Sequence, residues 1–155
     1  MKLSDHKLIR LITELMSQGL TPHKIALTVA LGVMLGVIPV VGSSTLLCAI
    51  AAVAFSINLP LIQVVNYLVY PLQLLLLIPF IQAGQWLFHR PPLPFSLTQL
   101  TALLRLKLWH ALAMLWEYIL HGLFAWLILG GMAALIIYLV LRPTLGLLSL
   151  KQTDV

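Results

Sequence analysis

Hydrophobic positions recur with helical spacing at the start of the chain. The apolar residues follow one another three or four positions apart, which is typical of one stripe of an α-helix. The stripe consists of Leu8, Leu11, Ile12, Leu15 and Met16. Charged residues fall off this stripe, and Gly19 is a typical helix stop. We predict an amphipathic helix over residues 1–19 that lies in a membrane interface, with a soluble partner groove as the alternative.

A long apolar segment without formal charge follows, from residue 25 to residue 89. The pair Thr21-Pro22 predicts the start of a second helix, because threonine caps helices well and proline is tolerated in the first turn. Gly32 and Gly36 share one face of this helix. Their spacing allows two membrane helices to approach closely, so we assign both glycines to helix packing.

Proline-centred breaks divide this apolar segment into shorter pieces. The breaks lie at residues 39–45, 58–60 and 70–73, and they leave apolar pieces at residues 45–57, 61–69 and 72–88. The first two pieces are too short to cross a bilayer. We therefore predict two re-entrant hairpins within a hydrophobic core domain at residues 20–90, with Pro39 and Pro71 at equivalent positions. Three ordinary kinked spans are the alternative.

The remaining chain predicts one complete membrane span. Residues 91–117 read as a proline-rich linker and an interfacial segment, and residues 143–155 as a polar tail. Between them, we predict a transmembrane helix at residues 118–142. Its residues 118–141 contain His121 as their only strongly polar residue, and the stretch, which is long enough to cross a membrane, ends at Arg142. The predicted fold class is all-α: a polytopic helical membrane protein.

Composition and charge agree with a membrane protein. The chain is 61% hydrophobic and only 8% charged, which a soluble fold could not bury. Its nine basic residues lie at the edges of apolar segments, which favours positive-inside anchoring over nucleic-acid binding. Two hairpins would place the N-terminus and residues 90–110 on the cytoplasmic side and the C-terminus opposite. In the three-span alternative, six basic residues would lie on one side of the membrane and three on the other.

The sequence offers little catalytic chemistry. The uncharged segment holds no carboxylate pair, and no histidine lies between His23 and His89 to activate a serine. Cys48 is the only cysteine, and no spacing typical of a metal site or phosphate loop occurs. His110 and His121 would lie too far apart along one helix to bind the same metal ion. We interpret Glu117 and His121 as a polar pair at the membrane interface. We expect no enzyme activity, no cofactor and no metal.

Uncharged polar residues inside the apolar segment are the better functional candidates. An amide or hydroxyl buried in lipid needs a partner, so these side chains should face other helices or a cavity. The polar residues are Ser43, Ser44, Thr45, Asn58, Gln63, Asn66, Gln73, Gln82 and Gln85. Hydrogen bonding between helices is the simpler interpretation. In the functional interpretation, Gly42 permits a turn, and Ser43 to Thr45 begin a half-helix. The free N–H groups of this half-helix would bind an anionic group, and Asn66 and Gln73 would face it.

The combination of these features resembles the bacterial "domain of unknown function 2062" family. The resemblance covers about residues 20–90 and rests on Thr21-Pro22, the glycine-rich helix, Pro39-x-x-Gly42 with the hydroxyls after it, and Asn58-Leu59-Pro60. Where that family has Asn-Pro-Leu-Thr, this chain has Tyr70-Pro71-Leu72-Gln73. The resemblance implies a membrane protein of the cell envelope without an established activity, and fusions to sugar-transferring domains in that family suggest the metabolism of surface polysaccharide or lipid-linked precursors. We expect a multi-pass protein of the bacterial inner membrane.

Two functions remain open from the sequence. In the first, the facing breaks form a path for a lipid-linked or small anionic substrate, as in a transporter or flippase-like carrier. In the second, the breaks only shape a scaffold that assembles with envelope enzymes, or with further copies of the chain as a homo-oligomer. The lipid bilayer is the expected partner in both.

The uncharged segment predicts how the protein fractionates. Because residues 25–89 cannot be solvated by water, the protein should sediment with membranes and require detergent for extraction. Ultracentrifugation after carbonate, high-salt and detergent washes measures this. Release by carbonate or salt alone would contradict the prediction.

Overall fold

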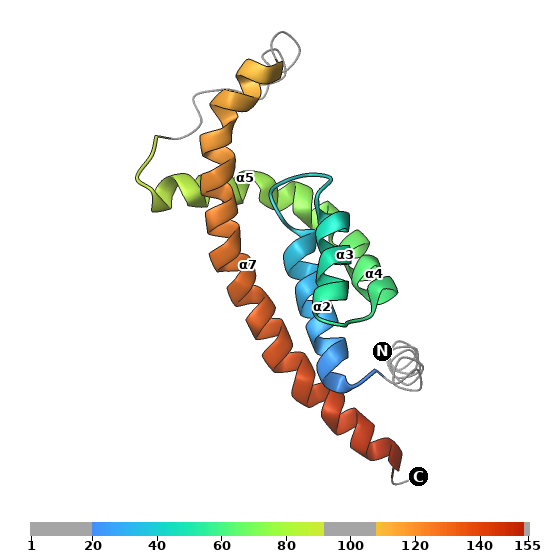
Figure 1. Cartoon of the computed structure of the whole chain (residues 1–155). Coiled ribbons are helices and arrows are strands. Elements are labelled where there is room, and N and C mark those ends of the chain that lie inside the picture. Colours follow the sequence, from blue (N-terminus) through green and yellow to red (C-terminus); the bar gives the residue numbers. More distant parts are fainter. Residues whose placement is uncertain (1–19, 92–107, 154–155) are drawn as a thin grey trace.

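A computed structural model describes residues 20–91 and 108–153, and these residues form five helices and no strand (Figure 1). The helices are α2 (Pro22–Gly36), α3 (Ser44–Ala54), α4 (Leu59–Leu68), α5 (Tyr70–Leu87) and α7 (Leu108–Thr153). The all-α class is therefore confirmed for this part of the chain. The predicted amphipathic helix at residues 1–19 lies outside the described residues.

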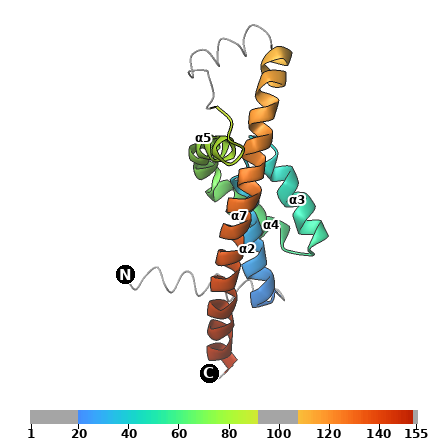
Figure 2. The same ribbon diagram turned by 90° about the vertical axis from the view of Figure 1, so that its left-hand side faces the viewer.

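The short helices gather beside one long helix. Figures 1 and 2 show α2, α3 and α4 grouped along the middle of α7, while α5 crosses α7 at a steep angle. Three clusters of buried side chains form the core, and α2 contributes to each of them. The helix α2 is thus the element on which the other helices pack.

Helix α2 begins where the sequence predicts. The Thr21 side chain accepts a hydrogen bond from the Lys24 backbone N–H at 3.3 Å, and Pro22 occupies the first turn. Its glycine face lies against α4 of the same chain. A Cβ atom on Gly32 would come within 2.8 Å of Val65 Cγ1, and one on Gly36 would overlap the side chain of Val69. Both glycines therefore serve packing within the chain.

The first break reverses the chain as predicted. Residues 37–43 connect α2 to α3, and Gly42 adopts a φ angle of +90°, which L-residues rarely adopt. The Ser43 hydroxyl donates to the Val40 carbonyl at 2.8 Å and tightens the turn. Helices α2 and α3 thus form a hairpin.

The second break differs from the predicted hairpin, because α4 and α5 are bent by only 63°. Val69 alone separates the two helices, and its backbone forms helical hydrogen bonds on both sides of the break. Its N–H donates to the Val65 carbonyl at 3.1 Å, and its carbonyl accepts from the Gln73 N–H at 2.9 Å. Pro71 lies in the first turn of α5, where its missing N–H needs no partner. The chain therefore bends at this point without reversing.

Helix α5 crosses α7 at a contact between backbones. A Cβ atom on Gly84 would overlap the His121 carbonyl, and one on Gly122 would lie 3.2 Å from Ile81 Cγ1. Only residues without a side chain permit two helices to approach this closely. The crossing fixes the end of α5 beside the first half of α7.

Helix α7 is longer than the predicted span at residues 118–142. It continues to Thr153 through Pro143, so the expected polar tail is mostly helical. Proline removes one backbone donor, and the neighbouring Thr144 hydroxyl donates to the carbonyls of Val140 at 3.0 Å and Leu141 at 2.8 Å. The stretch Trp116–Leu147 is long and apolar enough to cross a membrane.

The crossing of α5 and α7 predicts unequal effects of two glycine substitutions. Gly84→Ala should lower the free energy of unfolding by about 1–3 kcal/mol, because the new methyl group meets backbone atoms that cannot rotate away. Gly146→Ala, with no atom within 4 Å of the added carbon, should raise it by up to about 1 kcal/mol through helix propensity. Thermal unfolding in detergent, followed by circular dichroism, compares the two. Equal stability of both variants would refute the close crossing.

Candidate functional site

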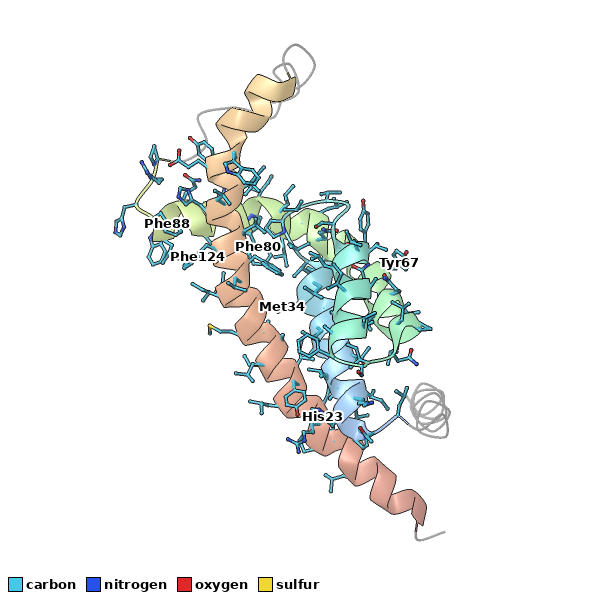
Figure 3. All side chains as sticks on the ribbon, viewed as in Figure 1. His23, Met34, Tyr67, Phe80, Phe88 and Phe124 are labelled. Atoms are coloured by element: carbon cyan, nitrogen blue, oxygen red, sulfur yellow. The ribbon has the colours of Figure 1, made fainter. Side chains whose placement is uncertain are left out.

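A pocket of about 280 Å³ opens between the start of α3 and the end of α4. Its lining combines small polar groups with aromatic rings. The lining residues are Val41, Gly42, Ser44, Thr45, Asn66, Tyr67 and Tyr70. Figure 3 shows Tyr67 on the side of α4 away from α7. The pocket therefore lies at the first proline-centred break and close to the second.

The start of α3 presents its backbone to this pocket. Ser43 is the N-cap residue, yet its hydroxyl bonds to Val40 and makes no capping hydrogen bond. The first N–H groups of a helix have no partner within the helix, and they carry a partial positive charge. Ser44, the first residue of α3, is only 4% exposed and lines this pocket. This end of α3 can accept an oxygen-bearing or anionic group.

Helix α4 contributes hydrogen bonds that hold α3 in place. The Asn66 side-chain amide donates to Thr45 Oγ1 at 3.4 Å and to Gln63 Oε1 at 3.3 Å. The Gln63 amide donates to the Thr45 carbonyl at 2.9 Å. Thr45 thus receives hydrogen bonds from two amide side chains, both on α4.

A second link joins the two breaks. The Gln73 amide nitrogen donates to the Ile38 carbonyl at 2.9 Å, which ties the start of α5 to the loop after α2. Gln73 is completely buried, and its side-chain oxygen has no hydrogen-bond partner among the described residues. Gln73 does not line the pocket. Its hydrogen bond to Ile38 instead joins the two breaks.

The structure brings together some of the residues predicted for this site and separates others. Of the nine positions assigned to the substrate path or the breaks, four line the pocket: Gly42, Ser44, Thr45 and Asn66. Pro39 and Ser43 belong to the adjoining loop, and Pro71 and Gln73 to the start of α5. Asn58 lies at the opposite end of α4, where its side chain accepts from the Leu61 N–H at 2.8 Å. Asn58 is therefore a helix cap remote from the pocket.

Three pocket residues were not among the predicted ones: Val41, Tyr67 and Tyr70. They are 51%, 62% and 43% exposed. In the sequence, these three residues stand directly next to Gly42, Asn66 and Pro71, and this adjacency is the signal that could have predicted them as lining residues. Apolar side chains are so common in this sequence that adjacency alone does not separate lining residues from the rest.

The pocket can bind but is poorly equipped for acid–base chemistry. Its lining contains hydroxyl, amide and phenol groups and no carboxylate, histidine, lysine or arginine. Histidine, aspartate, glutamate and lysine are among the side chains that most often perform general acid–base catalysis. The hydroxyl and amide groups of the lining can form hydrogen bonds with a polar molecule.

The polar pair predicted on the C-terminal helix is arranged differently. Glu117 pairs with Arg90 at 3.1 Å, and the His121 ring stacks on Phe88 with 4.5 Å between ring centroids. No group of three potential metal ligands occurs among the described residues, and the side chain of His110 lies outside them. The free thiol of Cys48 is completely buried in the core beside α2.

Comparison with known families identifies the class of protein. Residues 6–152 match the model of a family described as an uncharacterised protein conserved in bacteria (DUF2062). The match covers nearly the whole chain, well beyond the 20–90 region that carries the resemblance in the sequence. The chain therefore belongs to this bacterial family. No curated protein and no solved structure matches it.

Proposed function

We propose that this chain is a multi-pass protein of the bacterial cytoplasmic membrane that binds and carries a lipid-linked or small anionic substrate. The pocket between α3 and α4 is its binding site. The observation that carries the proposal is the gathering of Gly42, Ser44, Thr45 and Asn66, from separate helices and a loop, around one opening at an uncapped helix start.

The surface of the helices supports a membrane location. Large apolar side chains are exposed on α3, α4, α5 and α7, for example Val53 at 81%, Leu68 at 75% and Leu75 at 73%. Contiguous apolar surface of this kind marks contact with lipid or with a protein partner. The stretch Trp116–Leu147 in α7 can cross the bilayer, and α4 with α5 can form a broken span or a re-entrant segment.

The ends of the helices favour one of the two predicted topologies. His23 at the start of α2 contacts the hydroxyl of Tyr138 in the second half of α7, with 2.8 Å between Nδ1 and the oxygen. Arg90 pairs with Glu117 in the first half of α7. Figure 3 places His23 and Phe88 toward opposite ends of the molecule. The start of α2 and the C-terminal part of α7 thus lie toward the same end of the molecule. This supports the three-span alternative over the hairpin topology, and the positive-inside rule favours the cytoplasm for that end.

The structure of the pocket favours an anionic or oxygen-rich group as the bound part of the substrate. Free N–H groups at the start of α3 and the Ser44 hydroxyl supply donors. The rings of Tyr67 and Tyr70 supply apolar surface beside them. A headgroup attached to an acyl or polyprenyl chain has this combination of polar and apolar parts.

We predict that removing the pocket hydroxyls slows substrate movement. The Ser44→Ala, Thr45→Val variant keeps most of the side-chain volume but loses two hydrogen-bonding groups. It should lower the rate of flipping of fluorescent phosphatidylglycerol in proteoliposomes roughly thirtyfold, at about 1 kcal/mol for each of the two groups. Quenching of the outer leaflet by dithionite measures the rate, and complementation of a deletion strain's envelope phenotype tests the same variant in cells.

Thr28→Val is the matched control for this experiment. Thr28 is completely buried, and its hydroxyl donates to the Lys24 carbonyl at 2.6 Å on α2, away from the pocket. This variant should retain the flipping rate of the unmodified protein. If the pocket variant also flips lipid and complements normally, the carrier function is wrong. The scaffold function, which the exposed apolar faces of α3 and α4 favour, would then replace it.

The topology predicts a specific labelling pattern. Single cysteines at Ser4, Ser96 and Ser149 in a Cys48→Ala background report the N-terminal segment, the segment between α5 and α7, and the C-terminal end. An impermeant thiol reagent added to intact cells should label the cysteine at position 96 alone. Labelling at position 149 but not at position 96 would restore the hairpin topology.

A further inference from the structure

A second polar pocket lies at the opposite end of α5 from the first. Its volume is about 90 Å³, which holds several waters or one small tetrahedral group, since one water needs roughly 10–15 Å³ by this measure. The lining residues are Gln85, Arg90, Pro91, Glu117, Tyr118 and His121. None of them belongs to the pocket between α3 and α4.

The end of α5 positions two of these residues. The Arg90 N–H donates to the Gln85 carbonyl at 2.9 Å, and the His89 N–H donates to the Trp86 carbonyl at 3.2 Å. With His89 at a φ angle of +52°, this is a Schellman motif. The motif folds the chain back, so that Arg90 and Gln85 reach the same pocket.

Helix α7 supplies the opposite wall. Glu117 and His121 are one helical turn apart and therefore share a face. The contact of Gly84 with the backbone at His121 and Gly122 brings this face directly against α5. The pocket thus depends on the glycine crossing.

The pocket contains buried hydrogen-bonding groups that the described chain does not satisfy. Gln85 is 4% exposed, and neither its amide nitrogen nor its amide oxygen has a partner among the described residues. The buried Nδ1 atom of His121 is also without a partner there. A buried unpaired amide is costly, so groups in this arrangement indicate a bound polar molecule.

The charges indicate which molecule fits. Arg90 and Glu117 form an ion pair at 3.1 Å with side chains 57% and 58% exposed, so each retains free hydrogen-bonding positions. A purely anionic ligand would bind Arg90 but be repelled by Glu117. A ligand with a phosphate and an ammonium group matches both, and the Gln85 amide can donate to the phosphate and accept from the amine.

We propose that this pocket binds a phosphoethanolamine group, with the phosphate on Arg90 and Gln85 and the ammonium on Glu117. Such a group occurs both in a membrane lipid headgroup and in a free phosphate ester. The site is separate from the proposed carrier pocket, so either proposal can fail without the other.

The test uses the full chain purified in detergent and titrated with short-chain phosphatidylethanolamine, short-chain phosphatidylglycerol or free phosphoethanolamine, with calorimetry as the readout. The unmodified protein should bind the ethanolamine lipid roughly tenfold more tightly than the glycerol lipid. Competition by free phosphoethanolamine would show that the headgroup alone suffices. Failure to compete, with the lipid still bound, would assign the site to the membrane lipid.

Three variants separate the contributions. Gln85→Leu should weaken ethanolamine-lipid binding roughly a hundredfold, because two hydrogen bonds to charged groups are lost, one from the amide nitrogen and one to the amide oxygen. Arg90→Gln should weaken binding of both lipids. Glu117→Gln should remove only the preference for ethanolamine over glycerol.

Gln82→Leu is the matched control, because Gln82 lies on the same helix but is exposed and does not line the pocket. It should bind like the unmodified protein. Arg90 and Glu117 are largely exposed, so their variants keep the test decisive even if Gln85→Leu fails to fold. Absence of binding, unchanged headgroup preference in Glu117→Gln, or equal weakening by Gln82→Leu and Gln85→Leu would overturn the proposal.

Discussion

The carbonyl groups released where α2 ends must find hydrogen bonds in apolar surroundings, and the rest of the fold depends on how they do so. The Met34 carbonyl accepts from the Trp126 indole N–H at 2.9 Å, and the Ile38 carbonyl accepts from Gln73 at 2.9 Å. An unsatisfied buried carbonyl would be costly. These two bonds attach α7 and α5 to the same end of α2, and so they fix the positions of both polar pockets.

Glycine contacts complement these hydrogen bonds. Gly32 and Gly36 admit α4 to one face of α2, and Gly84 admits α7 to α5. Between apolar helices in an apolar solvent, close backbone approach and interhelical hydrogen bonds supply much of the specificity. Because the chain has few charged residues, glycines and amide side chains determine how its helices are oriented relative to one another.

The two pockets use different chemistry because they lie in different surroundings. The pocket at α3 and α4 has no charged lining residue and offers a helix start, the hydroxyls of Ser44 and Thr45, and two phenol rings. The pocket at α5 and α7 has an ion pair whose members are more than half exposed, beside a buried amide. Charge is tolerated in the second pocket because water or polar groups reach it. The first pocket relies on backbone dipoles and neutral donors.

The sequence by itself determined the helical class, the family, and several local features. Thr21 and Asn58 cap α2 and α4, and Gly42 turns the chain, because each depends on neighbouring residues alone. It did not determine that the second break would bend by 63° instead of reversing, since this depends on the hydrogen bonds around Val69. Nor did it indicate that Gln85, one of several similar glutamines, would meet Arg90 and His121. Only the tertiary structure decided this, because the meeting requires the crossing at Gly84, and contacts between helices distant in the chain leave no local pattern.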